Sequence, residues 1–187
     1  MRGISQIVSF TILTTAVLTL SITTFLWVQS NIQEAYYPVK DANVKNSMIA
    51  LDFALRNTAK GDIGFTDTVY IRTPDIFLGI YDDQNMIVAS YHRGTYSPPI
   101  TEEGSFTCCE NCSVIKDAKT GINMRRIPGT NVFASGGPIA EFAVCNPKIE
   151  IVYNSTCSVS KTGTGFLVYM KKTGYANNKT IVEMGIC

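Results

Sequence analysis

The first stretch of the chain is almost free of charge. After Arg2, no charged residue occurs before Glu34, and the residues between 4 and 28 are uncharged and largely apolar. A helix crosses the hydrocarbon core of a bilayer with roughly 20 such residues, at a rise of about 1.5 Å per residue. The pattern therefore predicts a transmembrane helix over residues 4–30, and the rest of the chain is interpreted as attached to it.

The residues that flank this run predict its orientation. Arg2 and the initiator amine place positive charge before it, which favours an N-terminus inside and residues 34–187 outside the cell membrane. A cleaved secretory signal peptide is the alternative, with a shorter apolar core and a small-x-small cleavage site. The longer run here is followed by WVQSNI at residues 27–32, without Ala-x-Ala, which favours a retained span.

Threonines recur at every fourth position of the apolar run: Thr11, Thr15, Thr19 and Thr23. This spacing places their hydroxyls in one slowly drifting stripe along a helix. Two interpretations stay open. The hydroxyls can bond back to carbonyls of the preceding turn, which makes them tolerable anywhere in a membrane helix. Alternatively, the stripe is a contact surface on which a second helix packs.

A second, amphipathic helix is predicted over residues 31–61, continuing into the exported part. Its apolar positions follow a spacing of four, three and four residues: Val44, Met48, Leu51 and Leu55. Gly61 suits a C-terminal stop. Because proline lacks an amide hydrogen and clashes with the preceding turn, Pro38 predicts a kink or short break near Tyr37.

After Gly61 the apolar positions follow the period of β-strands. The predicted strands cover residues 69–72, 76–81, 86–91, 139–144, 148–153, 165–171 and 180–186, with further short strands near 113–116. Turns are expected at 82–85, at 146–147 and between 174 and 179. The run at 166–170 is apolar throughout and indicates a central strand. The fold class is therefore α+β: a long N-terminal hydrophobic helix followed by an antiparallel β-rich head over residues 62–187.

All six cysteines follow the apolar run: Cys108, Cys109, Cys112, Cys145, Cys157 and Cys187. An even number, confined to the exported part, predicts disulfides in an oxidising compartment. The neighbours Cys108 and Cys109 are expected to bond different partners, because a bridge between adjacent residues strains the peptide. Cys109 and Cys112 have the spacing of half a zinc site, but no second pair completes it, so disulfides are favoured. The pairing stays open.

Three triplets match the acceptor pattern for N-glycosylation, with the asparagines Asn111, Asn154 and Asn178. All three lie in the part that the orientation of the helix places outside. They are candidate sites that would make the chain a glycoprotein.

The charge and the candidate chemistry favour a non-enzyme. From residue 62 onward, 11 Lys and Arg oppose 12 Asp and Glu, a net charge of −1, which argues against nucleic acid as a partner. The only histidine, His92, has no histidine partner for metal binding. Ser113 and Lys116 match the S-x-x-K of penicillin-recognising enzymes, but that serine must begin a buried helix and Ser113 lies in a strand-like stretch. No catalytic residue, metal or cofactor is predicted.

Arg2-Gly3-Ile4-Ser5, a long apolar helix directly after it and a β-rich exported part together resemble archaeal type IV pilin-like proteins. The resemblance implies a leader of residues 1–3, cut by a prepilin peptidase between Gly3 and Ile4. It also implies that the mature helix stays on the protein and packs with its own copies in a filament core, with the pilus assembly machinery as a further partner.

Three functions follow as hypotheses. The first is a pilin-like subunit of an archaeal cell-surface filament, which assembles through its helix and displays the head for adhesion. The second is a single-pass anchored ectodomain that binds an extracellular partner without polymerising. The third is an extracellular enzyme, which nothing in the motifs favours.

Overall fold

The computed structural model describes residues 2–73, 75–92, 108, 112–116, 123–136, 139–158, 160–163 and 165–187. The chain divides into two compact units, Met1–Lys40 and Asp41–Cys187, and we call the second unit the head. Helix α1 (Arg2–Lys60) contributes to both units.

Helix α1 continues through Pro38 without interruption. Of the two alternatives predicted near Tyr37, a break therefore does not occur, and the two predicted helical segments form one element. The helix ends at Lys60, and the amide of Gly61 donates to the carbonyl oxygen of Asn57 at 3.0 Å. The predicted stop at Gly61 is confirmed.

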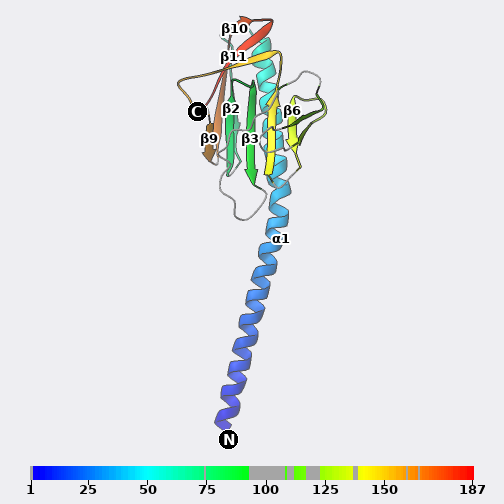
Figure 1. The fold of residues 1–187 in the computed structure, drawn as a ribbon. Coiled ribbons are helices and arrows are strands. Elements are labelled where there is room, and N and C mark those ends of the chain that lie inside the picture. The colour runs from blue at the N-terminus through cyan, green and yellow to red at the C-terminus, as the bar shows by residue number, and fades with distance from the viewer. Residues whose placement is uncertain are drawn as a thin grey trace. The chain divides into compact units, whose positions relative to one another are not determined.

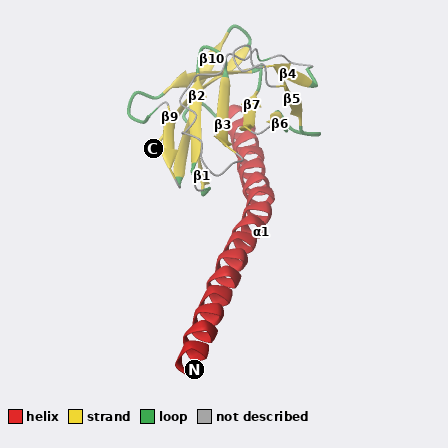
Figure 2. Cartoon of the chain, turned by 60° about the horizontal axis from the view of Figure 1, so that its bottom comes forward, coloured by secondary structure: helices red, strands yellow, loops and turns green. Residues whose placement is uncertain are grey.

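The core of the head forms around the apolar stripe of α1. The four predicted positions of this stripe are fully buried: Val44, Met48, Leu51 and Leu55. They belong to one hydrophobic cluster with residues of two β-sheets, such as Ile80 and Phe166. This part of α1 runs alongside the strands of the head in both views (Figure 1, Figure 2).

The smaller sheet has four strands in the order β1-β10-β11-β8. Its strands are β1 (Thr66–Ile71), β8 (Ile149–Tyr153), β10 (Phe166–Ala176) and β11 (Lys179–Ile186). β10 lies between β1 and β11, so the predicted central strand is confirmed. β8 pairs with β11 in parallel, whereas the other strand pairs that the structure describes in this sheet are antiparallel.

The larger sheet has seven strands in the order β4-β5-β6-β7-β3-β2-β9, and its described pairs are antiparallel. Its strands are β2 (Ile76–Tyr81), β3 (Met86–His92), β4 (Val114–Lys116), β5 (Asn123–Arg126), β6 (Val132–Ser135), β7 (Ile139–Cys145) and β9 (Ser160–Gly163). The β2–β3 hairpin confirms the turn predicted at 82–85. β5, β6 and β9 were not predicted, because each has only four residues, which is too short a run to show a period.

β7 and β8 are joined by the turn predicted at Asn146 and Pro147, where the amide of Ile149 donates to the carbonyl oxygen of Asn146 at 3.1 Å. The two strands nevertheless belong to different sheets. The turn is therefore a crossover between sheets, which allows both of them to cover the stripe of α1.

Two disulfides join described cysteines, Cys108 to Cys145 and Cys157 to Cys187. Cys112 is also disulfide-bonded, whereas Cys109 lies outside the described residues. Cys108 thus does not bond its neighbour, as predicted. Cys145 belongs to a second hydrophobic cluster, with Met86 and Phe133, against which Cys108 and Cys112 pack. The disulfides are therefore part of the packing of the head.

Lys172 is a fully buried lysine on β10 that holds the C-terminal end of α1. Its ammonium donates to the carbonyl oxygens of Ala59 at 2.9 Å and Gly61 at 2.6 Å, and to the hydroxyl of Tyr175. The last carbonyls of a helix lack intrahelical donors and carry partial negative charge, so a cation is favoured there. This contact fixes the end of α1 against the smaller sheet.

Asp52 is the corresponding contact to the larger sheet. Its buried carboxylate pairs with Arg56 at 2.9 Å and accepts hydrogen bonds from the backbone amide of Asn131 at 3.1 Å and from its side-chain amide at 3.3 Å. Nearer the start of the head, the hydroxyl of Tyr91 donates to Asp41. Polar contacts therefore join α1 to the rest of the head at three points along the helix: at Asp41, at Asp52 and at its C-terminal end.

We predict that Lys172→Met lowers the free energy of unfolding by roughly 2–4 kcal/mol, since it removes the buried ammonium that donates to the carbonyl oxygens of Ala59 and Gly61. The unfolding midpoint in denaturant, measured on the full chain in detergent, checks this. Lys171→Met is the matched control, because Lys171 is only partly buried on the next position of the same strand. Equal midpoints for the two variants would show that Lys172 does not hold the helix end.

Gly185 on β11 allows the segment that carries Cys157 to lie against the sheet. A Cβ atom at this position would stand 2.4 Å from the Cβ and 3.2 Å from the Sγ of Cys157. We therefore predict that Gly185→Ala lowers the free energy of unfolding by about 1–3 kcal/mol through overpacking.

Gly174→Ala is the control for this variant, because a Cβ there meets nothing within 4 Å. Both variants are compared by their unfolding midpoints without reductant. Equal unfolding midpoints for Gly185→Ala and the control would mean that the segment that carries Cys157 can shift without loss of stability.

Candidate membrane-spanning and assembly surface

The apolar part of α1 is exposed on all sides within its own unit. The span Val8–Gln29 has 22 residues and a mean hydropathy of 1.7, and none of it is buried. In the part of the chain that the structure describes, it is the helix that is long and apolar enough to cross a membrane. Its twelve large apolar side chains are exposed by between 39% for Val28 and 70% for Phe10.

This exposure is too costly to persist in water. Burial of a Val, Leu, Ile or Phe side chain contributes about 1.5–3 kcal/mol of stabilisation. Full burial of these twelve roughly half-exposed side chains would therefore add on the order of 10–20 kcal/mol. That is comparable with the whole net stability of a domain, about 5–15 kcal/mol. The helix therefore requires an apolar covering that the chain itself does not supply among its described residues.

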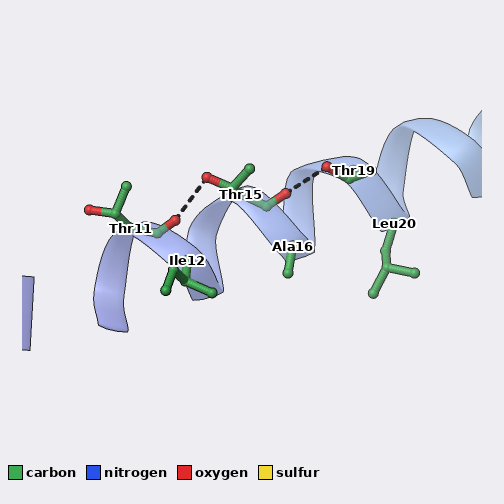
Figure 3. A pocket seen from close by; sticks show the side chains of 6 residues that line it. All are labelled: Thr11, Ile12, Thr15, Ala16, Thr19 and Leu20. Carbon is green, nitrogen blue, oxygen red and sulfur yellow. Dashed lines mark hydrogen bonds between the residues drawn. The ribbon is translucent and has the colours of Figure 1, made fainter. Parts of the chain in front are cut away.

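Several threonine hydroxyls of the span donate within the helix. The hydroxyls of Thr15 and Thr19 each donate to the carbonyl oxygen four residues earlier at 2.8 Å (Figure 3). The hydroxyl of Thr23 donates in the same way to Thr19, also at 2.8 Å. Thr14 does the same toward Phe10. Back-bonding, the first of the two interpretations of the stripe, is thus present in the structure. The hydroxyl donors of Thr15, Thr19 and Thr23 therefore need no second helix.

The stripe borders a shallow groove on the helix surface. The groove is lined by Thr11, Thr15 and Thr19 on one side and by Ile12, Ala16 and Leu20 on the other (Figure 3). Ala16 is the smallest of these side chains and lies between two long ones. A helix ridge from a neighbour could approach closely at Ala16, because small residues let two backbones come near each other.

Aromatic residues lie at the C-terminal end of the span and just beyond it, a feature that the sequence patterns above did not single out. Trp27 is 68% exposed, and Tyr36 and Tyr37 pack edge to face with 5.8 Å between their ring centroids. The ammonium of Lys40 lies 5.9 Å from the ring of Tyr36. Tryptophan and tyrosine gather at membrane–water interfaces, and their position around the end of the apolar run was the signal that could have identified them.

The predicted cleavage position lies at the start of α1. Gly3 and Ile4 are both helical, one residue and two residues after the first residue of the helix. The first N–H groups of a helix have no intrahelical partner, so unwinding this end breaks fewer hydrogen bonds than unwinding the middle of the helix. The side chains of these residues are not among those described.

The described residues of the head form no cluster of metal-binding side chains. They contain no group of three or more His, Cys, Asp or Glu residues that could hold a metal ion. Ser113 is exposed just before β4 and does not begin a helix. His92 is the last residue of β3, and its side chain lies outside the described part. A surface groove near Asp82, Asp83 and Glu150 is polar but is no such cluster.

The glycosylation candidates lie in contrasting places. Asn178 is exposed in a turn, Asn154 is buried, and Asn111 lies outside the described residues.

No protein-family model, no curated protein and no solved structure matches this chain. The functional assignment therefore rests on the apolar helix and on the β-rich, disulfide-bonded structure of the head.

Two charges in the middle of the span should release the chain from the membrane. We predict that Leu18→Arg combined with Leu20→Arg adds about 5–7 kcal/mol to the cost of insertion, at about 2.5–3.5 kcal/mol per arginine. The share of the full chain that stays with membranes during alkaline extraction should fall sharply. The double variant with isoleucine at both positions is the control and should behave like the parent. Unchanged retention with arginine would show that another part of the chain holds it to the membrane.

Proposed function

We propose that this chain is a pilin-like structural subunit of a cell-surface filament. Its N-terminal helix inserts in the membrane and then packs with copies of itself, while the head is displayed outside for adhesion or surface contact. The observation that carries the proposal is the apolar helix, exposed on all sides and joined without interruption to a disulfide-braced head. No catalytic activity is part of this proposal.

The build of the head supports an exterior location. Disulfides persist in oxidising compartments and are rare in the cytosol. The disulfides Cys108–Cys145 and Cys157–Cys187 tie segments of the chain to β7 and beside β11. The packing of the head therefore includes oxidised cysteines. With Arg2 on the inner side of the span, the head lies on the outer side.

The Arg2-Gly3 junction and the groove support assembly over simple anchoring. The sequence Arg2-Gly3 directly before the apolar run resembles a prepilin cleavage site, which a plain anchor does not need. The groove at Ala16 provides a surface on which a neighbouring helix can pack closely. By the same resemblance, a prepilin peptidase and an assembly machinery are partners.

The second candidate is a single-pass anchored ectodomain that binds an extracellular partner without polymerising. The observation that favours it is the back-bonding of the threonines. A span whose hydroxyl donors are internally satisfied is stable in lipid without a second helix.

N-terminal sequencing of the native protein separates the two candidates. We predict a sequence that begins at Ile4, because the peptidase would cut after Gly3. Negative-stain images of surface material sheared from the cells should then show filaments that contain the chain. An intact Met1 together with the absence of filaments would favour the anchored ectodomain and contradict the proposal.

Ala16→Phe supplies the matched test of the groove in the same cells. The substitution fills the groove and keeps the span apolar, so membrane retention should be unchanged whereas filament yield should fall. Leu18→Phe is the control, since it adds a ring at a position that does not line the groove. Equal yields for the two variants would show that the groove is not a packing surface.

A further inference from the structure

The hairpin between β10 and β11 presents Asn178 at its tip. Ala176 and Lys179 are the last paired residues, so the loop between the strands consists of Asn177 and Asn178. Both have positive φ angles, 49° and 62°, and both are exposed. Two left-handed residues in a two-residue loop are typical of a type I′ turn, which suits the right-handed twist of the strands and favours asparagine.

The turn accounts for an asparagine at position 178, and a β-branched residue such as Thr180 suits a strand. Thr180 lies in β11, opposite Tyr175 of β10 and beside Ile149 of β8. A hairpin of this kind places no demand for a hydroxyl two residues after the turn asparagine. That hydroxyl is the element that turns Asn178-Lys179-Thr180 into an acceptor pattern for N-glycosylation.

Asn154 carries the same pattern in a setting that disfavours modification. It is only 9% exposed, and its side-chain oxygen accepts hydrogen bonds from the backbone amide of Thr156 at 2.8 Å and from the hydroxyl of Thr156. A Cβ on Gly185 would stand 3.4 Å from the Cβ of Asn154, so the residue packs closely against β11. A bulky polar group on this amide would have to displace the segment that carries Cys157.

We propose that Asn178 is an N-glycan acceptor of the folded head and that Asn154 is not. This inference rests on the exterior location of the head in the proposed function. The donor would be an oligosaccharide linked to a lipid phosphate. The side-chain amide nitrogen of Asn178 attacks the anomeric carbon and loses one proton. A C–N bond forms as the C–O bond to the lipid phosphate breaks, and the lipid phosphate leaves with no change of oxidation state.

The setting of Asn178 also accommodates the product. The glycan would project from the tip of a hairpin whose strands continue without it, because the turn is made by the backbones of Asn177 and Asn178. Glycosylated asparagines are surface residues for the same reason: a large polar group must stay in water. The modification would shield the end of the smaller sheet in an assembled filament.

The test is glycopeptide mass spectrometry on the full chain, purified from cells that export it and that glycosylate a co-expressed reporter sequon. We expect a glycan mass on the peptide with Asn178 and the unmodified mass on the peptide with Asn154. Thr180→Val should reduce the Asn178 glycopeptide by about tenfold or more, because it removes the hydroxyl and keeps the turn asparagine. Thr180→Ser should retain it.

An unmodified Asn178 peptide, or a glycan on Asn154, would overturn the inference. The same samples distinguish this failure from failure of the exterior location. Thiols are alkylated before and after reduction, and cysteines that react only after reduction show that the head was exported. Oxidised cysteines with an unmodified Asn178 therefore contradict the inference alone, whereas cysteines that react without reduction contradict the location on which it rests.

Discussion

The burial of one apolar stripe of α1 by two sheets is the interaction on which the head depends. Val44, Met48, Leu51 and Leu55 are completely buried, and strands from both sheets join the same cluster. Each sheet buries its apolar face by packing against another layer, and here the helix is a layer that both sheets share. The crossover at Asn146 and Pro147 sends the chain from one sheet to the other, so both sheets contribute to this cluster.

The polar contacts of α1 add direction to this packing. Apolar burial is not directional. A helix can therefore slide or rotate on an apolar surface with little change in free energy. Buried charges with fixed partners cannot be displaced without losing their hydrogen bonds. Lys172 at the last carbonyls and Asp52 at Asn131 therefore set the position of the helix in the head. Neither contact was predicted, because each joins residues distant in sequence.

Local periodicity allowed most of the architecture to be predicted. The stripe of α1, its end at Gly61, the β2–β3 hairpin and the central place of β10 each depend on patterns within a few residues. The parallel pairing of β8 with β11 and the partner of Cys108 depend on pairs far apart in the chain, and β9 has no apolar period at all. At the helix surface, spacing identified the threonine stripe, but spacing alone could not choose between back-bonding and contact with another helix.

The threonine bonds constrain how the helix could assemble. Because Thr15, Thr19 and Thr23 already use their donors, hydrogen bonds between helices would add little driving force. Apolar burial does not favour a neighbouring helix over lipid either, since lipid tails are as apolar as leucine. What remains is close packing, for which Ala16 offers the room, together with contacts outside the membrane. Polymerisation would therefore depend on shape, and a substitution that fills the groove without adding polarity is the change to which it should be most sensitive.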